Sequence, residues 1–550
     1  MSPNDSMPKL GHQNNDTAHV QLPQPVITKL GCQSTTPGRK HKLNAYAFQQ
    51  DAIVTFKGHQ YATYWSNAGP DDGDALYLCV ARRQLRPRSD APVLDNEDEV
   101  RAESAYEWEV LELRDYKQTD DDGHNTISLG ICPGDGTIHL AFDHHCDILR
   151  YRYSRRDVAT QPCTVSWRPD IFSVTLDYLP GIPSTHKPLR DVTYPRFGFL
   201  GEDMFFSHRD GKAGLGNDHL YTYNGKNGRY KYIGPYLTGI QSNPYVNGMT
   251  SRDGVLHVTW VYRGFVDYPG WDDPLDTKHK QQAGPNGAEN NHNICYAYSD
   301  AGGYAWRNGR GEVIADLRDP AKFPIDVRGK GRTMTNDCNG IVVFDVPKGK
   351  GLMNQEAQAV DQEGGVHVLN RDMMNEGGTY LWKHYYRSSD GTWTQRALQV
   401  ITEGSKRGQV AISKTGDLYA ILPDSTTKSM RILRATKAGG YADYRQVWKG
   451  DGLGGEPLVD SARLEYDNVL SVFARNDPVD PAEHPAEGQA VAILDFELPM
   501  EDKDPKADED SMRDTSDPSD VDGQPISQAP KKRRLARKQA SGTALAEVSE

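Results

Sequence analysis

Cysteine, long apolar runs and excess positive charge are all scarce in this sequence. Its 550 residues include only seven cysteines and no C-x-x-C pair, which argues against a dense disulfide framework and favours a reducing compartment. No apolar run approaches the ~18 residues of a transmembrane helix, so we expect no contact with a membrane. A net charge of −13 argues against nucleic-acid binding by the folded part of the chain.

The two ends of the chain have little to bury. Residues 1–40 are polar and rich in Pro, Gln and Asn, and we predict that they are disordered. They contain no apolar signal-peptide core, so we expect an intracellular protein, or one that is secreted by an unconventional route. Residues 499–550 are acidic and then basic, which also predicts disorder. Within them PKKRRLARK, from Pro530 to Lys538, is either a nuclear localisation signal or an incidental basic cluster.

A tight turn followed by a strand recurs between these ends, in residues 41–498, which we predict form one catalytic domain. The clearest copies are DGTIHLAF, DGVLHVTW, EGGVHVLN and TGDLYAIL, and weaker ones are KGHQYATYW, GEDMFFSH and DNVLSVFA. Several intervals are close to about 50 residues, the length of a four-stranded propeller blade. An array of β-sandwiches would not repeat the same phrase at each interval. The predicted fold class is therefore all-β, a β-propeller of six to eight blades, of which we choose seven.

The phrase YSDAGGYAW, residues 298–306, resembles an Asp box, the hairpin motif of sialidase-like propellers. In that motif an aspartate bonds the backbone of the turn and a tryptophan packs between strands. We therefore expect structural roles for Asp300 and Trp306, and no site at this motif.

One short stretch, DGHNTISLGICPGDGTIHLAFDHHCDILRYRYS, contains four of the 17 histidines. Its two β-branched, apolar runs, 126–131 and 137–142, are separated by PGDG, a strong hairpin turn signal. A turn centred on PGDG pairs residues whose numbers sum to about 269. This pairing brings His124 close to His144 or to His145, at the end of the hairpin away from the turn. The pair is either functional or a satisfied structural pair of histidines.

Histidine, tyrosine and arginine also follow strand ends in the next predicted blades. This set of side chains suits an elimination across C4–C5 of a uronic acid, which needs a neutralised carboxylate, a base for the C5 proton and an acid for the leaving O4. Arginine supplies a fixed charge and a bidentate fork, and histidine and tyrosine can exchange protons. The scheme requires no metal or other cofactor.

Six phrases resemble the BNR-repeat propellers that include L-rhamnose-α-1,4-D-glucuronate lyases (polysaccharide lyase family 42) and ulvan lyases (families 24 and 25). They are GHNTISLGI, DGTIHLAFDHH, TYPRF, RDGKAG, HNICYAYSDAGGYAW and VHVLNRD. These relatives are seven-bladed propellers that cleave the bond between rhamnose and O4 of glucuronic acid by β-elimination. The resemblance implies a polysaccharide lyase acting on ulvan, or on the rhamnosyl-glucuronate ends of arabinogalactan or gum arabic, and leaves exo or endo action open.

The resemblance also implies roles for single residues. The family's two histidines fall on His124 and His144, its tyrosine on Tyr194, and its carboxylate-neutralising arginine on Arg209. His124 and Tyr194 would move the protons, in an order that is left open, while Arg209 and His144 would hold the carboxylate. Further substrate contacts are expected from Tyr245, Asn125, His145 and Arg263.

Two other functions compete with the lyase. A related glycosidase branch hydrolyses the same linkage with a histidine in a phrase like AFQQDAIVTF, where this chain has Gln49 and Gln50. An amide is neither an acid nor a base near neutral pH, which favours the lyase over an α-L-rhamnosidase. The second alternative is a non-catalytic propeller that binds a carbohydrate or a protein. The retained His, Tyr and Arg set favours the enzyme.

The expected partner is an oligosaccharide or polysaccharide that contains uronic acid, and the protein is expected to act as a monomer. Some relatives carry a structural metal. His292 and Cys295, at positions i and i+3, have suitable ligand chemistry for a structural zinc ion, and calcium is the other candidate. The competing interpretation is a buried cysteine next to a loop histidine.

Overall fold

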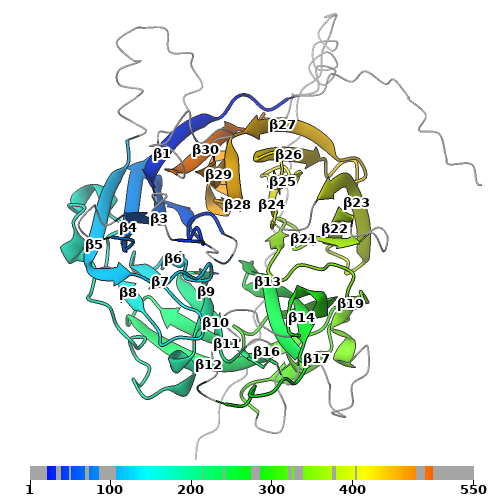
Figure 1. Ribbon diagram of the computed structural model, residues 1–550, viewed down its shortest axis with the longest axis horizontal. Coiled ribbons are helices and arrows are strands. Elements are labelled where there is room, and N and C mark those ends of the chain that lie inside the picture. Colours follow the sequence, from blue (N-terminus) through cyan, green and yellow to red (C-terminus); the bar gives the residue numbers. More distant parts are fainter. Residues whose placement is uncertain are drawn as a thin grey trace, which may run out of the picture. The chain divides into compact units, whose positions relative to one another are not determined.

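Seven sheets follow one another along the chain and form the blades of a ring in the computed structural model (Figure 1). Blade one consists of β2 (Ile53–Phe56), β3 (His59–Asn67), β4 (Leu76–Gln84) and β5 (Glu109–Gln118). Blade two has β6 (Ile127–Ile131), β7 (Ile138–Phe142) and β8 (Tyr151–Tyr153). Blade three has β9 (Thr193–Leu200), β10 (Asp203–Arg209), β11 (Asp218–Asn224) and β12 (Arg229–Thr238), and β18 (Ile325–Asp326) pairs with β12 in parallel.

The remaining four blades complete the ring. Blade four has β13 (Ser242–Arg252), β14 (Val255–Gly264), β15 (Asn291–Ser299), β16 (Ala305–Arg307) and β17 (Val313–Asp316), with β19 (Val342–Phe344) paired to β15. Blade five has β20 (Ala357–Val360), β21 (Val366–Met373), β22 (Tyr380–Arg387) and β23 (Trp393–Thr402). Blade six has β24 (Gln409–Ile412), β25 (Leu418–Asp424), β26 (Ser429–Ala435) and β27 (Arg445–Asp451). Blade seven has β28 (Leu453–Val459), β29 (Val469–Asn476), β30 (Ala490–Glu497) and β1 (Val26–Cys32). The predicted all-β, seven-bladed propeller is therefore confirmed.

The structure describes residues 21–32, 39–46, 48, 51–67, 73–85, 107–212, 215–239, 242–273, 275, 285–319, 325–326, 338–373, 379–402, 406–477 and 490–499. The tail 500–550 with its basic cluster, and the residues Gln49 and Gln50, lie outside these ranges. The expectations that rest on them stay predictions.

Each of the seven repeated phrases forms the second strand of one blade. In chain order they are β3, β7, β10, β14, β21, β25 and β29. In six blades the turn that opens the phrase joins the first strand to the second, because consecutive antiparallel strands are connected by short hairpins. In blade seven this connection contains a short helix, Ser461–Asp467. The number of phrases therefore equals the number of blades.

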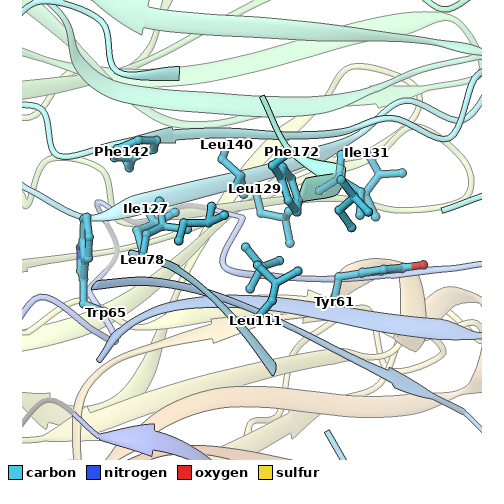
Figure 2. Packing of buried hydrophobic residues seen from close by; sticks show 14 of the residues in the cluster. Tyr61, Trp65, Leu78, Leu111, Ile127, Leu129, Ile131, Leu140, Phe142 and Phe172 are labelled. Atoms are coloured by element: carbon cyan, nitrogen blue, oxygen red, sulfur yellow. The ribbon is translucent and has the colours of Figure 1, made fainter. Parts of the chain in front are cut away.

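The core lies between adjacent blades. Figure 2 shows one such layer, in which Trp65, Leu78 and Leu111 of blade one pack against Ile127 and Leu140 of blade two. All five residues of β6 and of β7 are buried, because each sheet is covered on both faces by its neighbours. Burial on both faces explains why the sequence shows continuous apolar runs here in place of strict alternation.

The first strand of the chain, β1, closes the ring, so the predicted disorder of residues 1–40 is wrong for Val26–Cys32. For residues 1–20 and 33–38, which lie outside the described ranges, it stays a prediction. β1 pairs antiparallel with β30, with Val26 opposite Asp495 and Ile27 opposite Leu494. The Thr28 hydroxyl also accepts hydrogen bonds from Arg83 (3.2 Å) and Trp108 (3.1 Å) of blade one. β1 is an edge strand of mixed composition in which Val26 and Ile27 are exposed, so its order depends on a distant pairing partner that local composition does not indicate.

The hairpin at residues 298–306 has the expected structural role for Trp306, but Asp300 makes a different contact from the one predicted. Trp306 is fully buried and donates its indole N–H to the carbonyl of Gly303 at 2.8 Å. The turn itself is held by Ser299, whose hydroxyl accepts the backbone N–H of Gly303 at 3.0 Å. Asp300 instead forms an ion pair with Arg307. The prediction that the aspartate bonds the turn is wrong, because the serine hydroxyl already fills that position.

Helical structure is short in the described ranges. One α-helix, α2 (Ser461–Asp467), lies between β28 and β29, and Asp460 caps it by accepting the N–H of Arg463. Single turns of 3-10 helix occur at Pro162–Thr164, Pro169–Ile171, Lys187–Arg190, Ala288–Asn290 and Cys338–Gly340. None of the helices in the described part is long and apolar enough to cross a membrane.

Candidate active site

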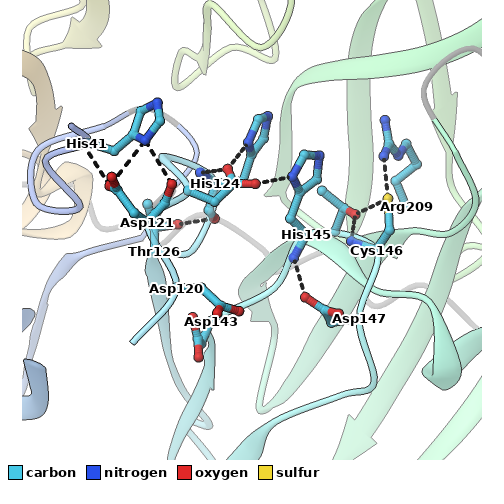
Figure 3. Close-up of polar contacts among 12 residues, drawn as sticks. His41, Asp120, Asp121, His124, Thr126, Asp143, His145, Cys146, Asp147 and Arg209 are labelled. Carbon is cyan, nitrogen blue, oxygen red and sulfur yellow. Dashed lines mark hydrogen bonds and ion pairs between the residues drawn. The ribbon is translucent and has the colours of Figure 1, made fainter. Parts of the chain in front are cut away.

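The hairpin of blade two brings two histidines face to face. β6 and β7 pair Ile127 with Phe142, the register that the PGDG turn predicts. Beyond the last pair, the imidazole rings of His124 and His145 are stacked, with ring centroids 3.8 Å apart and planes 17° from parallel. Both side chains lie at the end of the hairpin away from its turn (Figure 3). The histidine that meets His124 is therefore His145.

A single carboxylate binds both rings. The Nδ1 atoms of His124 and His145 lie 2.6 Å and 2.5 Å from the two oxygens of Asp122. Burial alone would raise the pKa of Asp122, but the hydrogen bonds from the two histidines lower it. Burial lowers the pKa of His145 to about 3 and also lowers that of His124. Near neutral pH the cluster therefore consists of an ionised carboxylate and two neutral imidazoles.

His144 has different surroundings. It is buried, and its Nε2 accepts the backbone N–H of Arg150 at 2.7 Å. Burial holds its pKa well below the ordinary value of histidine. Among the described residues, no hydrogen bond or ring contact joins His144 to His124 or Arg209. Of the two candidates that the hairpin register allowed beside His124, the structure places His145 there.

Tyr194 lies next to the histidine pair on a strained stretch of backbone. Its φ is +57°, a left-handed conformation that is rare for a bulky side chain and is found preferentially at functional sites. Its ring is 5.7 Å from that of His124. Phe48, which the sequence did not single out, stacks on His124 at 4.7 Å and contacts Tyr194 at 5.1 Å. Burial raises the pKa of Tyr194, so its hydroxyl keeps its proton.

Arg209 brings a buried positive charge to these aromatic rings. Its guanidinium lies over Tyr194, 5.1 Å from the ring centroid. It donates to the Tyr245 hydroxyl (3.0 Å), the carbonyl of Gly211 (3.3 Å) and the sulfur of Cys146 (3.7 Å). Only 2 % of Arg209 is exposed, and no carboxylate of the described residues forms an ion pair with it. Despite burial, the charge of Asp191 helps to raise the pKa of Arg209, but Asp191 forms no ion pair with the guanidinium. A buried charge without a contacting counter-ion is costly, so this geometry suits an anionic ligand.

A second guanidinium, that of Arg263, also contacts Tyr245. It is 4.5 Å from the Tyr245 ring centroid and donates to its hydroxyl at 3.4 Å. Its other donors bind the amide oxygens of Asn291 (2.9 Å) and Asn354 (2.8 Å). Burial would raise the pKa of Tyr245, but the charges of Arg263 and Arg209 outweigh it and lower that pKa. Tyr245 and Arg263 thus extend the cationic region from blade three into blade four.

Strand register explains why these residues meet. Arg209 ends β10 opposite Thr193 at the start of β9, and Arg263 lies opposite Asn243 at the start of β13. In each blade, the start of the first strand and the end of the second strand therefore lie at the same edge of the ring.

Asn125 follows His124 at this edge. It is buried, its carbonyl accepts the Trp65 indole N–H at 2.9 Å, and its amide oxygen has no hydrogen-bond partner among the described residues.

A cavity of about 700 Å³ lies at the opposite edge of the ring. Its walls include the turns around Lys57, Gly201 and Asp253, and the helix α2. Arg252 of blade four reaches across to Glu465 of α2, in an ion pair of 2.6 Å. None of the candidate residues lines this cavity. We assign the active site to the His, Tyr and Arg cluster, because that cluster carries the groups that proton transfer and anion binding require.

Within the described ranges, one group of three side chains could hold a metal ion. The donor atoms of Asp122, His124 and His145 all lie within 4.8 Å of one another. Their separations of 2.5–2.6 Å are those of hydrogen bonds. Two tetrahedral zinc ligands, each at about 2.0–2.2 Å from the ion, would be more than ~3 Å apart. Shared protons therefore fit this cluster better than a metal ion.

His292 and Cys295 of blade four were predicted to bind a metal ion. Within the described residues, no third histidine, cysteine or carboxylate forms a group of possible ligands with them. The Nε2 atom of His292 lies 3.4 Å from the hydroxyl of Ser242. Cys295 is fully buried in an apolar cluster. A structural zinc or calcium ion at this pair stays a prediction.

The protein is thus a β-propeller whose candidate active site combines histidine and tyrosine side chains with buried arginines. The model of the BNR repeat-containing family matches residues 59–400, and the chain belongs to this family. No curated protein matches the sequence.

Two kinds of solved structure share the fold. The crystal structure of polysaccharide lyase Uly1 superposes with a TM-score of 0.58 at 16% identity, over 87% of this chain and 100% of that one. An ulvan lyase of polysaccharide lyase family 25 superposes with a TM-score of 0.53 at 12% identity, over 86% of this chain and 96% of that one. At these identities the likeness shows the seven-bladed fold.

Proposed function

We propose that this protein is a polysaccharide lyase that cleaves the rhamnose-α-1,4-glucuronate linkage by β-elimination, so that O4 leaves with the rhamnose. The observation that carries the proposal is the buried Arg209 guanidinium, which has no carboxylate partner among the described residues and lies beside a neutral histidine and a protonated tyrosine. A uronate carboxylate would supply a directly contacting counter-ion, and the neighbouring groups provide a base and an acid.

Each step of an elimination has a group suited to it. Arg209 would bind the uronate carboxylate and make the C5 proton more acidic by stabilising the charge that develops there. His124 has its Nδ1–H directed at Asp122, which leaves Nε2 unprotonated and able to accept the C5 proton. The electron pair then forms the C4–C5 double bond as the C4–O4 bond breaks. Tyr194 would protonate O4, since its pKa is raised.

The remaining cluster residues would bind the substrate. His145 replaces His144 in this assignment because it, and not His144, is stacked on His124. Tyr245 and Arg263 extend the cationic surface beyond Arg209, where a neighbouring part of an acidic chain would lie. Asn125, with an unpartnered amide oxygen within the described region, would contact a sugar hydroxyl.

The choice of linkage rests on the resemblance in the sequence and on one relative. A solved family 25 ulvan lyase, similar in fold at 12% identity, has -[GlcA(1-4)Rha3S]- bound. For this chain, uronic-acid-containing glycans such as ulvan, arabinogalactan and gum arabic are therefore the proposed substrates. Action as a monomer inside the cell completes the proposal.

The deciding experiment follows the ultraviolet absorbance of the unsaturated uronate while the full chain is incubated with ulvan and, separately, with gum arabic. A rise with either glycan that is lost in His124→Ala supports the lyase. His41→Ala serves as the control, since His41 contacts Asp121 outside the cluster. Free rhamnose without the absorbance would indicate hydrolysis, and no product at all would favour a carbohydrate- or protein-binding propeller.

A further inference from the structure

The base of the proposed reaction belongs to a three-residue unit that the sequence analysis did not contain. Asp122 lies two residues before His124, and its side chain is 23% exposed, against 10% for His124 and 6% for His145. One oxygen of the carboxylate faces the Nδ1 of His124 and the other faces the Nδ1 of His145. Asp122 also accepts the backbone N–H of His124 at 3.0 Å, which fixes the carboxylate relative to that ring.

These contacts determine where each ring carries its hydrogen. An ionised carboxylate can only accept hydrogen bonds, so a neutral imidazole that binds it must carry its hydrogen on the bonded nitrogen. Both Nδ1 atoms are therefore protonated and both Nε2 atoms carry lone pairs. The partner of an imidazole nitrogen sets the tautomer and the direction of the other nitrogen.

We propose that Asp122 is the positioning residue of the active site, which holds His124 in the Nδ1–H tautomer so that its Nε2 can take the C5 proton. This inference rests on the proposed function. Asp122 then stabilises the imidazolium that forms, because its negative charge lies next to the new positive charge. His145 holds the second oxygen of Asp122 and stacks on His124, which restricts rotation of both rings.

The charges around His124 determine the sign of a pH test. Burial lowers the pKa of His124, Asp122 raises it, and the guanidiniums of Arg209 and Arg407 lower it further. His145 and Tyr194 also face the ring, and Asp122 is the one carboxylate of the described residues that binds it. Loss of the Asp122 charge therefore moves the acid limb of kcat against pH to lower pH, although the maximum rate falls.

Asp122→Asn tests the proposal, with Asp121→Asn as the matched control. Asp121 is the adjacent carboxylate and binds His41 in a similar way, but outside the cluster. We expect Asp122→Asn to lower kcat by at least about a hundredfold and to shift its acid limb to lower pH, while Asp121→Asn leaves both unchanged. An Asp122→Asn enzyme with wild-type kcat and pH profile would overturn the proposal.

A second measurement does not depend on activity or on the stability of the variant. Nitrogen NMR of the wild-type chain, labelled at histidine and assigned with His124→Ala and His145→Ala, reports which ring nitrogen carries hydrogen. Two Nδ1–H rings support the proposal, even if no glycan is cleaved and the proposed function fails. Nε2–H rings, or a bound metal ion with both Nδ1 atoms unprotonated, would overturn it.

Discussion

Arg209 of blade three donates a hydrogen bond of 3.0 Å to the hydroxyl of Tyr245 in blade four, and its guanidinium also lies 5.3 Å from the centroid of that ring. The contact joins two blades at the edge where the histidine pair also lies. It directs one donor of Arg209 at a neutral phenol rather than at a carboxylate, so the guanidinium keeps its charge available to a ligand. The predictions below depend on this arrangement.

Replacement of Arg209 by lysine should lower kcat/KM by at least about a hundredfold. Lysine keeps the positive charge but lacks the planar fork that can bind Tyr245 and a carboxylate together. Arg252→Lys is the control, because Arg252 binds Glu465 at the opposite edge of the ring. Steady-state kinetics on the preferred glycan give the comparison, and near-normal activity of Arg209→Lys would remove Arg209 from the proposed mechanism.

Tyr245 should ionise earlier than the other tyrosines near the site. Arg263 and Arg209 lower the pKa of Tyr245 despite its burial, whereas burial raises the pKa of Tyr194. As pH rises toward the ordinary tyrosine value of about 10, the near-ultraviolet absorbance of tyrosinate should increase first from Tyr245. The Tyr245→Phe variant should lack this early component. Identical titration curves for the two proteins would contradict the prediction.

Tyr194→Phe should lower kcat by about a hundredfold or more, because it removes the proton donor for O4, while the thermal unfolding temperature stays close to that of the wild type. The aromatic ring and its contacts with His124 and Phe48 remain in the variant. Tyr385→Phe is the matched control, since the hydroxyl of Tyr385 is buried and has no partner within the described ranges. A large loss of stability in Tyr194→Phe would instead indicate a structural role.

Stability should fall as pH decreases below about 6.5, the ordinary histidine value. Burial lowers the pKa of His139, His208 and His145 to about 3 in the folded protein. Between those values the unfolded chain binds protons that the folded protein does not, so each such histidine removes up to about 1.4 kcal/mol of stability per pH unit. Denaturant unfolding at pH 7 and pH 5 measures the effect, and His139→Asn should reduce its slope.

Removal of residues 1–32 should lower the unfolding temperature, because it exposes the backbone of β30 along its pairing edge. It also removes the Thr28 hydroxyl that binds Arg83 and Trp108 of blade one. Removal of residues 1–20, which leaves β1 in place, is the control. Equal unfolding temperatures of the two truncated proteins would show that β1 adds little to the closed ring.

The sequence predicted the ring because its signals are local. Each repeated phrase combines a turn with a strand, and each forms the second strand of a blade. The PGDG turn likewise fixed the register that brings His124 to His145. Tyr194 and Arg209 were expected from family resemblance, and the structure brings both to the histidine pair.

The remaining features depend on contacts that no local pattern contains. β1 is ordered by a strand that begins at Ala490, and Phe48 meets His124 in a cluster that also contains Tyr194 and Tyr245 of later blades. Asp122 resembles any acidic turn residue until both rings are placed around it. The choice between His144 and His145 needed the direction of each side chain, which is set by the bend after β7, where Asp143 has a φ of +64°.

The pairing of β1 with β30 also sets an order of events during synthesis. Val26 leaves the ribosome long before Asp495, its partner across the ladder, so six blades can form before the other three strands of the seventh have been synthesised. The early strand stays unpaired throughout this interval, with Val26 and Ile27 as exposed apolar side chains. Closure must therefore wait for β30, and a chain that stops before residue 490 leaves an open ring with a free edge.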